Sequence, residues 1–269
     1  MKNVLVIFLI SLVIAIFIAA PVIAEKNREL VSVTDIKWQK LNPARGDKSP
    51  QAGTLWGDRH GAVPTGFLVK FVDGFSSPPH IHNATYRAVV IRGLIHNDDP
   101  SATKMWMPAG SFWTQPKGEV HITAAKGQTN VAFVEIDKGP YLVLPVDQSF
   151  DEGERPINLD VSNVVWVDPG RFPNDIKIAY LWGSLGEGQS NGTFVKLPAG
   201  FTGQIESLGA VFRAVVVTGQ LQYQEAKSKQ LRPGSYFGSK GKATHLVSNQ
   251  NKEESILYIH TNGGFDIYE

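Results

Sequence analysis

The sequence contains no cysteine. This absence excludes disulfide bonds, thiolate metal ligands and a lipid-anchored amino terminus, so any metal ion has to be held by nitrogen or oxygen atoms. Net charge is nearly absent too, because 26 Lys and Arg residues are matched by 25 Asp and Glu residues. No basic stripe interleaved with aromatic residues is present, and we therefore expect no nucleic acid among the partners.

Long hydrophobic runs are confined to the amino terminus. A positively charged start precedes an apolar run over residues 4–20, and Pro21 and Ala24 follow it. This order is typical of a secretory signal peptide and predicts residues 1–24 as that peptide. An uncleaved membrane anchor is the alternative, because the run approaches the length that spans a bilayer. We expect a periplasmic or secreted protein that has no membrane association after cleavage.

The rest of the chain shows no helix longer than a few turns. Residues 67–72 and 87–91 are short β-branched and aromatic runs that Gly74 and Gly93 bring to an end. Such runs predict strands, and many of them in close succession predict an all-β barrel or sandwich.

The chain contains one unit twice. Residues 74–93 recur as residues 200–219 with eight identical positions, at an offset of 126 (200 − 74). Further along the chain the offset becomes 124 (245 − 121), so that His121 corresponds to His245. Self-similarity over this length indicates a tandem duplication.

The duplication predicts the domain boundaries. We expect two homologous units, at residues 30–150 and 158–269. The polar stretch 147–156, which ends in proline, is the expected linker between them.

Histidines distinguish the first unit from the second. His80 and His82 are two positions apart, so on a strand their side chains point to the same face. Pro116 and Gly118 form a turn that can bring His121 back toward the pair. Three imidazoles on one side of a metal ion leave coordination positions open for water, oxygen or substrate. A polar barrel interior that no longer binds metal is the alternative.

With these motifs the sequence resembles a double-domain member of the cupin superfamily. The matching residues are, for the first motif, Gly74, His80, His82 and Gly93 and, for the second, Gly110, Pro116, Gly118 and His121. The resemblance implies two tandem cupin barrels (double-stranded β-helix or jelly roll), the first of which binds metal. In the second unit Glu206 and Leu208 replace the first two histidines, which implies that this barrel has lost its metal.

The first motif departs from the cupin pattern at one position, where Tyr86 replaces the usual glutamate. Cupins with three histidines and no carboxylate resemble non-haem dioxygenases that cleave diketones and thiols. The sequence is also similar to cupins grouped with acetylacetone dioxygenase-like proteins and with anti-sigma factors. The resemblance implies one divalent ion (iron, zinc, manganese or copper) and dioxygenase-like cleavage of a small dicarbonyl-type molecule.

Other functions remain open. A non-catalytic protein that binds or senses a metal ion or ligand is the first alternative. A structural protein associated with a polysaccharide or a surface is the second. The expected partners are a small-molecule substrate or ligand and, since cupins often form dimers, a second copy of the chain.

Two further residues are candidates for catalysis. Tyr86 could bind the ion or donate a hydrogen bond to substrate, although its counterpart Phe212 favours simple packing inside the barrel. Glu119 lies two residues before His121, so strand alternation could direct its carboxylate to the site. A solvated turn residue is the alternative for Glu119.

The remaining histidines are expected to lie outside the site. His60 and His96 are predicted in surface loops, and His260 is interpreted as incidental. Glu206 and His245 could form a buried hydrogen-bonded pair in the space of the lost metal.

Overall fold

Strands dominate the structure, a computed structural model that describes residues 27–173, 175–186, 188–224 and 227–269. The helices in these ranges are short 3-10 turns, η1 (Val33–Asp35), η2 (Pro43–Lys48), η3 (Val146–Gln148) and η4 (Val161–Asn163). The all-β prediction is therefore confirmed. None of the helices described could span a membrane. The predicted signal peptide lies outside the described residues.

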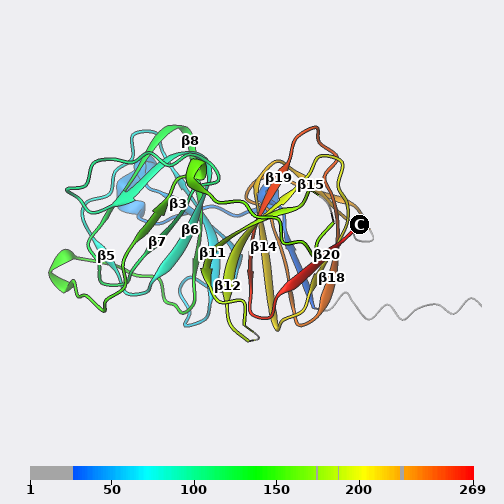
Figure 1. Ribbon diagram of the computed structural model, residues 1–269. Coiled ribbons are helices and arrows are strands. Elements are labelled where there is room, and N and C mark those ends of the chain that lie inside the picture. The colour runs from blue at the N-terminus through cyan, green and yellow to red at the C-terminus, as the bar shows by residue number, and fades with distance from the viewer. Residues whose placement is uncertain (1–26, 174, 187, 225–226) are drawn as a thin grey trace, which may run out of the picture.

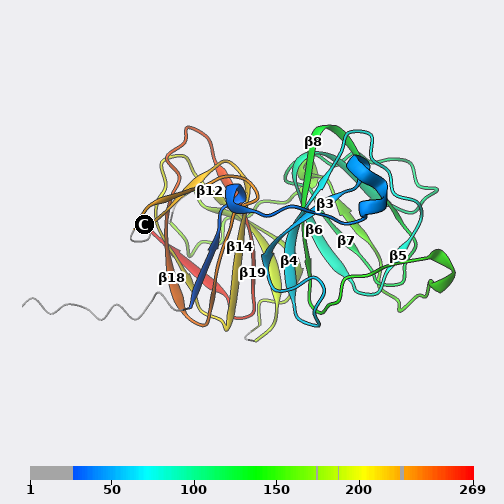
Figure 2. The same ribbon diagram turned by 180° about the vertical axis from the view of Figure 1, so that it is seen from behind.

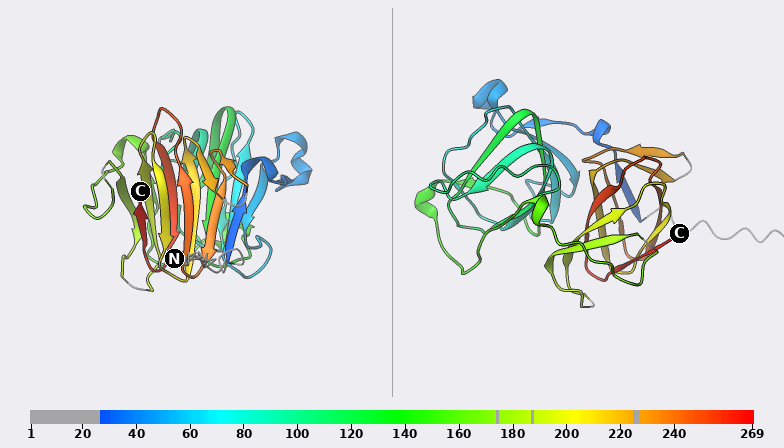
Figure 3. Two further views of the ribbon diagram at one scale, coloured as in Figure 1. Left: turned by 90° about the vertical axis from the view of Figure 1, so that its right-hand side faces the viewer. Right: turned by 45° about the horizontal axis from the view of Figure 1, so that its top comes forward.

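Two jelly-roll barrels lie side by side, the first in cyan and green and the second in yellow to red (Figure 1; Figure 3, right). Each has one large antiparallel sheet. In the first barrel its strands are, in spatial order, β10 (Ile157–Leu159), β7 (Phe112–Gln115), β6 (Tyr86–Asp98), β8 (Ile122–Ile136), β4 (Thr65–Phe71), β3 (Gln51–Trp56) and β2 (Gln39–Lys40). In the second they are β1 (Arg28–Val31), β17 (Tyr236–Lys240), β14 (Val211–Thr218), β19 (Ser255–Thr261), β12 (Asn191–Leu197) and β11 (Lys177–Gly183).

A smaller sheet closes each barrel. In the second barrel it consists of β16 (Lys229–Leu231), β15 (Leu221–Gln224), β18 (Ala243–Ser248), β13 (Thr202–Ser207) and β20 (Phe265–Tyr268). In the first barrel, β5 (Ile81–His82) pairs with β9 (Val143–Leu144). The long strands β6 and β8 bend together near Gly93, where φ is +80° and an added Cβ would lie 2.2 Å from the Asn130 side chain. Their far ends therefore reach the closing side.

The two barrels exchange their first strands. β1 pairs with β17 of the second barrel, placing Val31 opposite Tyr236, and β10 pairs with β7 of the first, placing Leu159 opposite Phe112. In Figure 2 the dark-blue β1 accordingly lies among the strands of the C-terminal barrel. The predicted unit boundaries remain a prediction, and these two pairings cross between the units.

The large sheets pack against each other and form an apolar core between the barrels. This core explains why β4 and β12 are buried along nearly their whole length, on both faces of the sheet. Among its fully buried members are Leu68, Val89, Phe112 and Phe133 of the first barrel and Val215, Val217, Phe194 and Tyr258 of the second.

An arginine and a tryptophan that occur in both copies of the repeated unit meet at this interface. The Arg87 guanidinium lies 3.7 Å from the Trp182 ring centroid, and Arg213 lies 5.1 Å from that of Trp56. Each barrel thus contributes an arginine that stacks on the other barrel's tryptophan, an arrangement that stabilises through cation–π attraction. Their repetition in the sequence reflects the symmetry of the contact.

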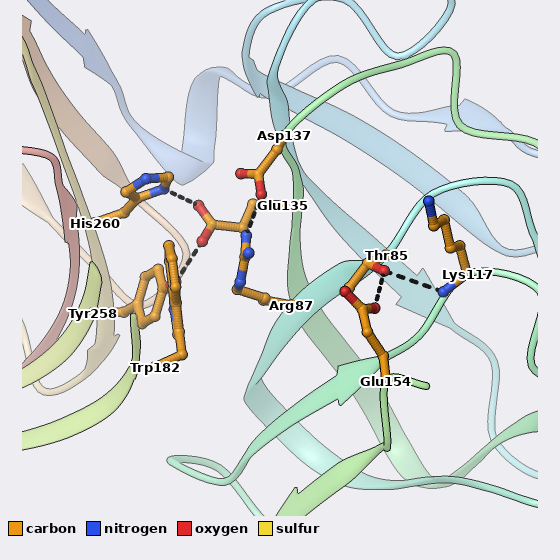
Figure 4. A network of polar contacts seen from close by, with 9 residues as sticks. All are labelled: Thr85, Arg87, Lys117, Glu135, Asp137, Glu154, Trp182, Tyr258 and His260. Atoms are coloured by element: carbon orange, nitrogen blue, oxygen red, sulfur yellow. Dashed lines mark hydrogen bonds and ion pairs between the residues drawn. The ribbon is translucent and has the colours of Figure 1, made fainter. Parts of the chain in front are cut away.

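A buried polar network also crosses the interface (Figure 4). Glu135 accepts hydrogen bonds from Tyr258 Oη and from His260 Nδ1 (3.0 Å), and Arg87 lies beside it and pairs with Asp137 (2.9 Å). Burial raises the pKa of Glu135, but His260, Arg87 and the hydrogen bonds outweigh burial and hold it below its ordinary value. The interpretation of His260 as incidental is wrong, because the residue joins the two barrels.

Candidate metal centre

Three histidines converge in the first barrel. His80, just before β5, and His121, just before β8, lie directly opposite each other and exchange both main-chain hydrogen bonds (3.1 and 3.0 Å). The Gly118 N–H donates to the His82 carbonyl (2.8 Å), which holds the turn of the second motif against the first. One ligand nitrogen from each of the three imidazoles lies within 4.8 Å of the other two.

Main-chain carbonyls determine which nitrogen of each ring faces the centre. Each Nδ1 is paired with a carbonyl oxygen: that of Pro78 for His80 (2.9 Å), that of Leu142 for His82 (2.8 Å) and that of Glu119 for His121 (3.3 Å). Because a carbonyl can only accept, each Nδ1 carries the proton in the neutral ring and each Nε2 keeps its lone pair. Such partners orient a histidine for metal binding.

The environment keeps the three rings neutral. Burial lowers the pKa of His80, of His82 and, to about 3, of His121. The charges of neighbouring imidazoles lower the pKa of the latter two further. Neutral imidazole is the form that binds a metal ion.

The residues fit a metal ion. His121 Nε2 is buried and has no hydrogen-bond partner among the described residues, which is costly for a polar atom. An ion held by the three Nε2 atoms would satisfy it. Imidazole ligands suit zinc, copper and iron, and three of them leave positions open.

His80 and His82 line a cavity of about 580 Å³, a volume typical of small-molecule sites. Its walls are mainly apolar and aromatic: Leu41, Pro43, Pro50, Val69, Phe71, Phe75, Pro78, Tyr86, Trp113, Ala132, Val134, Tyr141 and Val143. Arg45 of η2 also lines it, with its guanidinium 5.0 Å from the Phe75 ring centroid. No Asp or Glu is found among the described residues that line the cavity.

Tyr86 lies in the cavity wall with its hydroxyl turned into the barrel. The hydroxyl donates to Asn97 Oδ1 (2.9 Å) and accepts a long contact from Trp113 Nε1 (3.4 Å). Asn97 is held in turn by Gln115 and Thr123, each at 2.8 Å. The proton of Tyr86 is thus engaged by a buried amide, which agrees with the packing interpretation.

Glu119 contributes its main chain to the centre. Its carbonyl accepts from His121 Nδ1 and from Gln115 Nε2. The side chain lines a separate hollow of about 150 Å³ formed with the expected linker, where the Phe150 N–H donates to the Gly118 carbonyl. The carboxylate therefore does not join the three nitrogens, and burial raises its pKa.

Tyr141 is a site residue that the sequence reasoning missed. Its ring stacks on that of His82 with centroids 4.4 Å apart, and its hydroxyl donates to His82 Nε2 (3.1 Å). A signal was present: in the 124 offset Tyr141 corresponds to Phe265 (265 − 141). The two ring pairs match as well, since Tyr141 lies 6.0 Å from Tyr86 and Phe265 lies 6.3 Å from Phe212.

Within the described ranges the second barrel has no such cluster. His245 is fully buried, stacks on Phe212 and is hydrogen-bonded to Tyr223 Oη (2.8 Å) and Ser239 Oγ (3.1 Å). Glu206 instead accepts from Gln204, so the expected Glu206–His245 pair is wrong. Large aromatic side chains fill this interior.

The second barrel should become less stable in acid because of His245. Burial, and then the charge of Arg28, lower the pKa of His245 to about 3. Its contribution to stability is therefore complete above the ordinary value of about 6.5 and is lost as the pH falls toward 3, by up to about 1.4 kcal/mol per pH unit. His245→Gln should reduce the pH dependence of the unfolding free energy, measured in urea at about pH 7 and about pH 4, while the contribution of the buried histidines of the first barrel remains. His60→Gln, at an exposed position, should keep the slope; an unchanged slope in His245→Gln contradicts the assignment.

Two expectations about other side chains can be compared with the structure. His96 was expected in a surface loop, but it is buried in β6 because its end of that strand forms part of the closing side. His60 is exposed as expected. Trp113 lines the cavity.

Residues 29–268 match the DUF4437 family, described as a domain of unknown function. The chain belongs to this family. The matched region contains both barrels, so both copies of the repeated unit lie within the one family domain. Among curated proteins none matches the sequence.

Solved structures share the fold at low sequence identity. A candidate dioxygenase from Nostoc punctiforme is 13% identical with a TM-score of 0.67, covering 88% of this chain and 83% of that one. The oxalate decarboxylase of Lactobacillus farciminis is 11% identical (TM-score 0.59; 91% and 88% covered). Salicylate 1,2-dioxygenase of Pseudoaminobacter salicylatoxidans is 12% identical (TM-score 0.52; 77% and 73% covered). These are cupin-fold proteins, and the predicted cupin fold is confirmed.

Proposed function

We propose that this chain is an exported, metal-dependent enzyme that oxidatively cleaves a small dicarbonyl-type molecule in its first barrel. The observation that carries the proposal is the convergence of three neutral histidines, each presenting Nε2, beside an apolar cavity that His80 and His82 line. The cupin-fold dioxygenases among similar structures support this choice of chemistry. The proposed location follows from the amino-terminal sequence.

Each group in the cavity has a proposed role. His80, His82 and His121 hold one divalent ion as neutral imidazoles. Such an ion supplies Lewis acidity toward a substrate oxygen and, if it is redox-active, activation of dioxygen. The apolar walls exclude water and bind the carbon skeleton of the substrate. Arg45, which has no acidic partner among the described residues, favours a substrate with anionic character, such as a deprotonated dicarbonyl.

The residues around the ion also limit the chemistry. Because no carboxylate lines the cavity in the part of the chain described, no Asp or Glu there can serve as a general base. This favours a reaction in which substrate binds already deprotonated. It equally favours the second candidate function, a protein that binds or senses a metal-chelated ligand without turnover.

Metal analysis followed by oxygen uptake tests the proposal. The protein is purified from its native compartment, and its metal content is measured before acetylacetone or a thiol is added. Iron or copper at one ion per chain, with oxygen consumed in step with acetylacetone, is the expected result. Copper is the stronger expectation for an exported protein, because its site is filled outside the cytoplasm. There the affinity order of divalent ions favours copper over iron. Zinc with no turnover supports the binding or sensing alternative.

The assembly in solution is a separate part of the proposal. We propose that the chain binds a small-molecule substrate or ligand and pairs with a second copy of itself. Light scattering of the purified protein decides between monomer and dimer.

A further inference from the structure

Tyr141 is positioned differently from every other polar group in the cavity. Its hydroxyl lies 3.1 Å from His82 Nε2, the atom that would bind the ion. The rings are nearly parallel, with 18° between their planes, so they are stacked rather than coplanar. The hydroxyl therefore lies to one side of the imidazole plane, whereas the Nε2 lone pair lies in that plane. A metal ion can occupy the lone pair while the phenol remains beside it.

The phenol is also held in place independently of this hydrogen bond. The Tyr141 N–H donates to the Arg59 carbonyl (3.1 Å). Asn83 holds both neighbours, donating to the Pro140 carbonyl (2.9 Å) and accepting from the Leu142 N–H (2.9 Å). If His82 Nε2 held an ion, the Tyr141 hydroxyl would lose its acceptor, and these contacts would keep the ring in place.

The two tyrosines of the cavity differ in this respect. Tyr86 occupies the position of the missing glutamate, but its proton is engaged by Asn97 deep in the barrel. Tyr141 has no hydroxyl partner among the described residues except the ligand atom itself. Of these two tyrosines, only Tyr141 can therefore present a free O–H to a molecule bound beside His82.

We propose that Tyr141 contacts the substrate, donating a hydrogen bond to the substrate oxygen that an ion at the three histidines would hold beside His82. The hydrogen bond selects oxygen donors that carry negative charge, such as an enolate, because charged acceptors form the stronger bonds. This deepens the proposed function and depends on it, since the role requires an ion at the three histidines.

The test uses cobalt(II), whose visible spectrum reports its ligands, and azide as a small anionic probe. The mature protein is loaded with cobalt(II) and titrated with azide, and Tyr141→Phe is compared with the unmodified protein. The variant should take up cobalt with an unchanged spectrum, because the phenol is not a ligand. It should then bind azide at least about tenfold more weakly, which corresponds to about 1.4 kcal/mol. Tyr180→Phe, at an exposed position in β11, is the matched control and should behave as the unmodified protein.

The outcomes separate the two proposals. Normal cobalt uptake with equal azide affinity in Tyr141→Phe overturns the role of Tyr141 and leaves the metal centre intact. A changed cobalt spectrum in the variant before azide is added overturns it as well, because the phenol would then be a direct ligand. If the unmodified protein takes up no cobalt, the proposed function is itself overturned.

Discussion

His82→Ala is expected to reduce the metal content of the purified protein from one ion per chain to less than about a tenth of that. The substitution removes one of three nitrogen ligands, and even the loss of a residue that only orients a ligand costs about 10- to 100-fold in affinity. The measurement is elemental analysis after dialysis. A second readout is thermal unfolding, since a bound ion raises the melting temperature of the native state only when the site is intact.

His60→Ala is the matched control for this prediction. His60 is an exposed histidine of the same barrel and is absent from the cluster of ligand atoms. Its substitution should leave metal content and the metal-induced rise in melting temperature unchanged. Full metal content in His82→Ala, with the protein folded by circular dichroism, would show that the three histidines are not the metal site.

Glu135→Ala is expected to lower the free energy of unfolding by about 2–6 kcal/mol, because it leaves two buried polar groups without a partner and each costs about 1–3 kcal/mol. The side chains of Glu135 and His260 are 2% and 6% exposed. Without the carboxylate, His260 Nδ1 and Tyr258 Oη lose their partner in a place that water does not reach. Chemical denaturation near neutral pH measures the change.

Asp137→Ala provides the control, because Asp137 pairs with Arg87 beside the same network but is 60% exposed. Exposed pairs contribute about 0–1 kcal/mol, so this variant should stay close to the unmodified protein. Equal effects of the two substitutions would contradict the assignment of the buried network as a main stabilising contact between the barrels.

The histidine cluster could be predicted because its geometry is local. The spacing of His80 and His82 places them on one face, and the turn at Gly118 brings His121 opposite His80 through direct main-chain pairing. Strand alternation and turn chemistry are visible in any sequence. The duplication helped as well. Residues that both copies share could be assigned to the fold, and the histidines that only the first copy contains, His80 and His82, could be assigned to the site.

Tyr141 and His260 could not be predicted in the same way, because their partners are remote. Tyr141 lies 59 positions from His82, in a loop whose path depends on Asn83. His260 lies 125 positions from Glu135, in the other barrel. Such contacts depend on how distant segments pack against each other. The alternation of apolar and polar residues within one strand does not report this packing.

The exchange of β1 and β10 was missed for a related reason. An edge strand satisfies its hydrogen bonds equally well against either large sheet, since the edges formed by β7 and β17 are equivalent by duplication. The choice between them depends on the path of the chain after each strand.

The exchange of β1 and β10 relates the two halves of the chain as the two subunits of a strand-swapped dimer would be related. Cut between its repeats, the molecule would become two similar polypeptides, each lending its first strand to the other about a twofold axis, with arginine stacked on tryptophan in both directions. That is the description of a domain-swapped homodimer. In a single chain, unlike a symmetric dimer, the two halves need not share the same chemistry. Accordingly, aromatic side chains fill the space around His245 in the second barrel, whereas the first barrel has its histidine cluster there.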